Sequence, residues 1–129
     1  MRPFFLGRSL SPYLFYGFFI SIVAYFSFFY RLDFLPLYVW DESRNAINAL
    51  EMLANGKFTV TYFDNKVDLW NTKPPFLVWL LSLSINFLGP SELAVRLPSA
   101  LSGLITTAIV FVFMGRYLNN YLAGFFAAL

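Results

Sequence analysis

The sequence predicts a polytopic all-α membrane protein, with an amphipathic helix lying at the membrane interface in its first loop. Hydrophobic residues make up 59% of the 129 residues and charged residues 12%, against about 45–50% and roughly 25% in globular domains. A soluble domain of this size could not bury so much apolar surface, and a disordered chain is far less hydrophobic. Eleven of the sixteen charged residues lie between positions 31 and 73, so long uncharged runs flank one polar loop, as in multi-span membrane proteins.

The composition also excludes several functional classes. Neither cysteine nor histidine is present, which rules out disulfides, thiol nucleophiles and imidazole bases, and any metal site would have to use carboxylates. The sequence contains no glycine-rich phosphate loop and no serine triad motif. A net charge of +2 is too small to indicate a nucleic-acid partner.

The first predicted membrane span covers residues 9–30. These residues carry no charge and lie between Arg8 and Arg31. As a helix they would extend about 33 Å, enough to cross a hydrocarbon core of roughly 30 Å.

The polar loop 31–73 is predicted to contain one helix and one extended piece. The helix begins at Asp41 and ends at Gly56, a common helix terminator. Its apolar stripe, predicted to face the bilayer, consists of Ala46, Ala49, Leu50 and Leu53. Residues 58–62 alternate apolar and polar side chains and precede the turn-prone pair at 64–65, which predicts a short strand that ends in a turn.

The second apolar run is predicted to cross the membrane over residues 75–91. A helix from Pro75 to Leu88 would extend only about 21 Å, which is short of a full crossing. Three explanations stay open: a locally thinner bilayer, a helix that continues past Gly89, or a re-entrant segment.

The third predicted span covers residues 97–115. Pro98 is expected in the first turn of its helix, and residues 92–96 are expected to form a polar hinge. A fourth span starts at Tyr121 and has only nine residues, so the chain is expected to be part of a longer protein.

Asp41 and Glu42 are the first candidate functional residues, because they lie at the predicted start of the loop helix. An aspartate there can simply cap the helix. A carboxylate held at the membrane face can also act as a base, or bind sugar hydroxyls or a metal. The two interpretations are compatible.

Lys73 is the second candidate, because Pro74 and Pro75 fix it where the second apolar run begins. It could extend its ammonium from the membrane boundary into water, or bind a phosphate as a point charge. Arg96 is expected to anchor a boundary or to pair with Glu92. The three tryptophans are expected to anchor the interface, with stacking on a sugar ring as the alternative; they are Trp40, Trp70 and Trp79.

The order of these motifs resembles the N-terminal part of GT-C glycosyltransferases that use polyprenyl-phosphate sugars. The similarity covers roughly residues 37–118 and is greatest to protein O-mannosyltransferases and lipid A aminoarabinose transferases. The motifs, in order, are Leu37-Tyr38-Val39-Trp40-Asp41-Glu42, Ala46, Glu51-Met52-Leu53-Ala54-Asn55-Gly56, Lys73-Pro74-Pro75, Trp79, Leu88-Gly89-Pro90-Ser91-Glu92 and Ala94-Val95-Arg96-Leu97-Pro98-Ser99.

The resemblance implies an inverting transfer of a sugar from a polyprenyl-phosphate donor to a lipid, glycan or protein acceptor. It matches Asp41, with Glu42 beside it, to the active-site acid of the first outer loop, and Lys73 to the lysine near the donor phosphate. Such a step needs a base near the acceptor and a cation near the departing phosphate. Thr72 stands where aminoarabinose transferases carry a metal-binding glutamate, so no metal site is assigned here, and a divalent metal stays open only for a full-length protein.

The resemblance also implies a multi-pass protein of the bacterial inner membrane, with a cytoplasmic N-terminus and loop 31–73 outside. Counting lysines and arginines favours the opposite orientation, because most of them lie in that loop. Two other classes stay open: a non-catalytic membrane subunit, and part of a transporter for an anionic substrate. Transporter sites usually lie near the bilayer midplane, whereas these charges lie at span boundaries.

Overall fold

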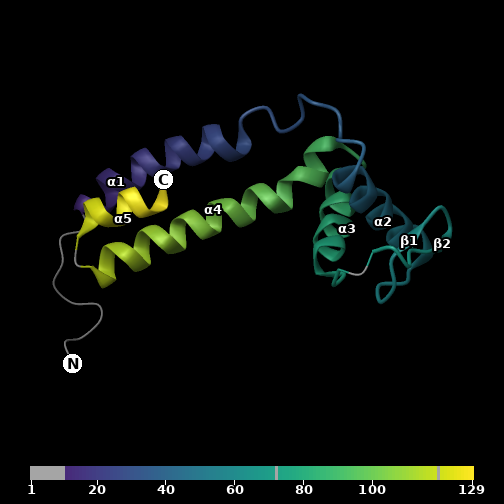
Figure 1. Cartoon of the computed structure of the whole chain (residues 1–129). Coiled ribbons are helices and arrows are strands. Elements are labelled where there is room, and N and C mark those ends of the chain that lie inside the picture. Colours follow the sequence, from purple (N-terminus) through teal and green to yellow (C-terminus); the bar gives the residue numbers. More distant parts are fainter. Residues whose placement is uncertain (1–10, 72, 119) are drawn as a thin grey trace. The chain divides into compact units, whose positions relative to one another are not determined.

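A computed structural model describes residues 11–71, 73–118 and 120–129 of the chain. Figure 1 shows that this part of the chain is mainly helical and contains one two-stranded hairpin. The described residues form two compact units, one from those within 31–101 and one from those within 1–30 and 102–129. The predicted helical character is confirmed.

The first unit (31–101) is built on two packed helices, α2 (Asp41–Asn55) and α3 (Phe76–Leu88). Helix α2 ends as predicted, because Gly56 adopts φ 64°, a left-handed conformation that glycine accepts without strain. Helix α3 ends at Leu88 and does not continue past Gly89. The core of this unit consists of Ala46, Ala49 and Met52 of α2, Val78, Leu81 and Ile85 of α3, and Ala94 and Val95 beyond them.

The apolar stripe of α2 is therefore partly covered by protein. Ala46 and Ala49 are almost completely buried in the core with α3, whereas Leu50 is 39% exposed. Burial of Ala46 and Ala49 needs no bilayer in this arrangement, and the location of α2 at the membrane surface stays a prediction.

A hairpin follows α2, with strands β1 (Tyr62–Phe63) and β2 (Lys66–Val67). The predicted turn is confirmed: Asp64 and Asn65 have φ values of 54° and 57°, as a two-residue hairpin turn of type I′ requires. The predicted strand over 58–62 is wrong except at its last residue. The segment before β1 is held differently, because the indole N–H of Trp79 donates to the Phe58 carbonyl at 2.6 Å.

Helix α4 (Glu92–Tyr117) begins earlier than predicted. The expected hinge at 92–96 and the expected start at Pro98 are wrong, since these residues form the first turns of α4 and Pro98 lies inside the helix. The start is fixed by Ser91, whose hydroxyl accepts the Ala94 N–H at 3.2 Å and so satisfies one of the free donors of a first turn.

Helix α4 is the one helix in the described ranges that is long and apolar enough to cross a membrane, judged by length and composition. The apolar helices Leu14–Phe29 and α3 are shorter. The crossings predicted for residues 9–30 and 75–91 therefore stay predictions.

The second unit contains α1 (Ser11–Ala24), a π-helical continuation η1 (Tyr25–Phe29), the later part of α4, and α5 (Tyr121–Ala128). Residues 9 and 10 of the first predicted span lie outside the described residues. Helix α5 begins where the fourth span was predicted, and the Asn120 side chain accepts the N–H groups of Leu122 and Ala123 at 3.0 and 3.3 Å.

Small residues allow close contacts in this unit, as they do between membrane helices in general. A Cβ atom placed on Gly124 of α5 would lie 2.7 Å from the backbone nitrogen of Gly115 in α4. A Cβ atom on Gly103 would lie 2.9 Å from the ring of Phe28. Gly124 therefore needs to be glycine, because backbone atoms lie against it, whereas a side chain at Gly103 would require the Phe28 ring to move.

Candidate functional site

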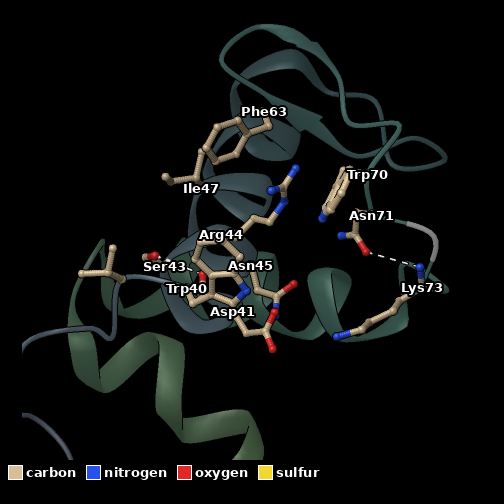
Figure 2. Close-up of a pocket in the computed structure, with 11 residues that line it drawn as sticks. Trp40, Asp41, Ser43, Arg44, Asn45, Ile47, Phe63, Trp70, Asn71 and Lys73 are labelled. Carbon is tan, nitrogen blue, oxygen red and sulfur yellow. Dashed lines mark hydrogen bonds between the residues drawn. The ribbon is translucent and has the colours of Figure 1, made fainter.

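A pocket of about 380 Å³ lies beside the N-terminal turns of α2, within the first unit (Figure 2). Its walls come from the start of α2, from the hairpin, and from the segment that leads to α3. The lining residues are Val39, Trp40, Asp41, Ser43, Arg44, Asn45, Ile47, Phe63, Trp70, Asn71 and Lys73.

Two of the predicted site residues, Asp41 and Lys73, line this pocket together although 32 positions separate them. Figure 2 shows the carboxylate of Asp41 and the ammonium of Lys73 directed into the same part of it. Trp40 occupies the N-cap position of α2, without a side-chain capping bond, and Asp41 is the first helical residue. Capping by Asp41 is therefore not the observed arrangement.

Glu42, the third predicted site residue, does not line the pocket. Its carboxylate pairs with Arg96: the guanidinium donates from Nε to Oε1 at 2.6 Å and from Nη2 to Oε2 at 3.1 Å. The N–H of Tyr38 donates to the same Oε2 at 2.8 Å. These hydrogen bonds, led by the one from Arg96, lower the pKa of the Glu42 carboxyl. Glu42 is thus ionised and occupied by protein partners.

Arg96 has a wider role than the sequence indicated. Its ion-pair partner is Glu42 rather than the expected Glu92. It also donates to three backbone carbonyls of the connector before α2, at distances of 2.7–3.0 Å. These carbonyls belong to Leu32, Leu35 and Pro36. Arg96 therefore ties the start of α4 to the connector and to the first turn of α2.

Asp68 is an anchor that the sequence analysis missed. Its side chain is 2% exposed and accepts two hydrogen bonds from Arg44, from Nη2 at 2.6 Å and from Nε at 3.1 Å. The buried amide of Asn48 donates a third at 3.2 Å. The hydrogen bonds from Arg44 and, after them, from Asn48 lower the pKa of Asp68, while burial opposes the shift. One available signal was the spacing of Arg44 and Asn48, which places both on one face of α2.

The tryptophans do not share one role. Trp40 and Trp70 line the pocket, and both are about four-fifths exposed. Trp79 lies outside the pocket lining and binds the Phe58 carbonyl. The first two are available to a ligand or to a membrane surface, and the third anchors a loop.

Residues 72–129 match the family model of dolichyl-phosphate-mannose-protein mannosyltransferases. The resemblance predicted from the sequence is confirmed. The match includes Lys73, α3, α4 and α5, and it begins after Asp41 and Glu42.

Two proteins similar to this chain are uncharacterized proteins of Aquifex aeolicus (strain VF5). One is 39% identical over 103 residues, which is 80% of this chain and 24% of the relative. The other is 30% identical over 89 residues, which is 69% of this chain and 17% of the relative. The chain thus spans about a quarter or less of these proteins. No solved structure matches it.

The pocket presents one carboxylate and one ammonium that are not bonded to each other. Within the described ranges, neither side chain forms an ion pair or a side-chain hydrogen bond. No group of three aspartates or glutamates among the described residues lies close enough to hold a metal ion. The arrangement can therefore accept a proton at Asp41 and bind an anion at Lys73.

Proposed function

We propose that this chain is part of a membrane glycosyltransferase that moves a sugar from a polyprenyl-phosphate carrier to a lipid, glycan or protein acceptor. The observation that carries the proposal is the meeting of Asp41 and Lys73 in one pocket. Support comes from the family match, which begins next to Lys73 and names enzymes with lipid-phosphate sugar donors.

The reaction is a single displacement at the anomeric carbon. An acceptor hydroxyl oxygen forms the new bond to that carbon, and the bond between the carbon and the phosphate oxygen breaks. The hydroxyl proton passes to the carboxylate of Asp41. The polyprenyl phosphate leaves with the bonding electron pair, and the Lys73 ammonium stabilises its negative charge.

Glu42 supports this site without entering the pocket. Because Arg96 and the Tyr38 N–H occupy its carboxylate, it is a poor proton acceptor. We assign it a positioning role, in which it holds the first turn of α2 that carries Asp41. The pocket is assigned to the non-cytoplasmic face of a bacterial inner membrane, where the lipid carrier presents its sugar.

The test uses full-length protein, a lipid-linked sugar donor and a measured rate of sugar transfer. Asp41→Asn keeps the size and helix compatibility of the side chain but removes the base, so we expect transfer to fall by about 10²–10⁴-fold. Lys73→Met keeps the apolar stem and should raise the KM for the donor. Glu51→Gln is a matched control on the same helix, because Glu51 does not line the pocket.

The outcomes separate the functional classes. Normal transfer by Asp41→Asn would remove the catalytic role of this residue. Donor movement across the membrane without cleavage, by the parent protein, would indicate a transporter that binds an anion at Lys73. Absence of both activities in the parent would favour a non-catalytic subunit.

A further inference from the structure

Asp68 is a buried carboxylate for which the proposed reaction has no use. It does not line the pocket, yet five hydrogen bonds converge on its two oxygens. Three come from side chains of α2, as described above. The other two come from the backbone N–H groups of Trp70 and Asn71, at 3.2 and 3.3 Å.

We propose that Asp68 is a positioning residue that holds the Lys73 segment against the start of α2 and so sets the separation of Lys73 from Asp41. The chemical roles of those two groups rest on the proposed function. The placement of the segment rests on the hydrogen bonds alone.

A continuous series of hydrogen bonds connects α2 to Lys73. Arg44, one turn after Asp41 on α2, donates to Asp68. Asp68 accepts the N–H of Asn71, and the Asn71 side-chain oxygen accepts the N–H of Lys73 at 3.3 Å. Figure 2 shows this last bond at the edge of the pocket. The series therefore ends at Lys73 itself on one side and, on the other, at Arg44, which lies one turn after Asp41 on α2.

The chemistry of the site requires a carboxylate at position 68. All five partners are donors, and an ionised carboxylate has about four lone-pair sites and no proton to clash with them. An asparagine has one acceptor oxygen and one donor NH₂ group. Because Arg44 donates to both oxygens, the NH₂ group of an asparagine would meet the guanidinium in either orientation, together with the other donors on that side. The asparagine of Asp68→Asn thus has nearly the same shape as aspartate but cannot accept hydrogen bonds at both of its terminal side-chain atoms.

The first experiment measures position without using activity. The 129 residues contain no cysteine, so Asp41→Cys and Lys73→Cys can be combined in the full-length protein, after replacement of any cysteine elsewhere. The yield of intramolecular cross-link with a short bis-methanethiosulfonate reagent reports how closely the segment is held. We expect Asp68→Asn to lower this yield at least fivefold, whereas Glu51→Gln should leave it unchanged.

Glu51 is a matched control because its carboxylate also accepts a loop N–H, that of Asn65, at 3.2–3.3 Å. Asn71→Ala is a milder variant that breaks only the last bond of the series, and we expect it to lower the yield about twofold. Asn71→Ala also keeps the proposal testable if Asp68→Asn does not fold. Equal yields in the parent and in either variant would overturn the proposal.

The second experiment asks whether Asp68 acts through Lys73, by measuring the donor KM in a double-mutant cycle. If it does, Asp68→Asn should raise KM severalfold in the parent and cause no further change in the Lys73→Met protein. Equal effects in both backgrounds would show that Asp68 acts elsewhere and would overturn the proposal. If Lys73→Met alone leaves KM unchanged, the proposed phosphate role of Lys73 fails, while the cross-linking result still decides the role of Asp68.

Discussion

Arg96→Met should release the connector that precedes α2. The guanidinium makes five hydrogen bonds, two to Glu42 and three to backbone carbonyls between positions 32 and 36. Methionine keeps the apolar length of the side chain but replaces none of these bonds. The connector would then lose the contacts that hold it to α4.

The size of the effect follows from the exposure of the ion pair. Removing one partner of a fully buried pair costs roughly 3–5 kcal/mol. The side chains of Arg96 and Glu42 are 16% and 22% exposed. Water can therefore reach part of the Glu42 carboxylate that Arg96→Met leaves without its partner, and it screens this charge. We expect a loss of about 2–3 kcal/mol of local stability. This corresponds to roughly 30- to 150-fold faster opening of the connector.

Hydrogen–deuterium exchange measures this opening directly. Two N–H groups of the connector are hydrogen-bonded: that of Phe34 to the Arg31 carbonyl at 3.1 Å, and that of Tyr38 to a Glu42 oxygen of α2 at 2.8 Å. Their exchange should accelerate by the factor above in Arg96→Met. Arg96→Lys should recover only part of the protection, because an ammonium lacks the planar fork. Exchange within threefold of the parent in Arg96→Met would refute the reasoning.

Three further predictions concern other parts of the chain. The pKa of Asp68 in the folded protein lies below the ordinary 3.8. The stability that its ion pair contributes should therefore be complete above pH 3.8 and be lost as the pH falls through the lower folded pKa. An acid-unfolding curve that is the same for the parent and for Asp68→Asn would contradict this. Gly124→Ala should destabilise the second unit by about 1–3 kcal/mol through overpacking. Gly17→Ala is the control and should be tolerated, because its Cβ would lie 3.8 Å from the nearest neighbour. Thermal unfolding of the two variants measures the difference. In intact cells, a membrane-impermeant thiol reagent should label Asn65→Cys and spare Ser91→Cys; labelling of both would indicate that α3 is re-entrant.

The fold could be predicted where local rules decide it. Helix α2 begins and ends where its first acidic residue and Gly56 indicated, and the hairpin turn lies at the predicted pair. The error at Pro98 arose because proline usually marks a first turn, whereas here Ser91 begins the helix seven residues earlier. The hydroxyl of Ser91 and the Gly89-Pro90 pair before it set the start of α4, so that Pro98 lies inside the helix.

The candidate site was only partly predictable, because its anchors join distant parts of the chain. Sequence spacing offered Glu92 as the partner of Arg96, four residues away on the same helix, an exposed type of pair worth about 0.3–0.5 kcal/mol. The observed partner, Glu42, is 54 residues away and accepts two charge-assisted bonds. Asp68 was missed for the same reason, since Arg44 is 24 residues before it. Only tertiary packing brings such partners together.

The two anchors also explain why Asp41 is available to the pocket. Successive residues of an α-helix point about 100° apart, so the first turn of α2 directs its charged side chains to different sides. Glu42 is bound by Arg96, and Arg44 is bound by Asp68. Asp41, which forms neither an ion pair nor a side-chain hydrogen bond with the described residues, is left facing Lys73 across the pocket. Two charges of this helical turn thus fix the neighbouring segments, and the third, Asp41, is available for the role proposed for it.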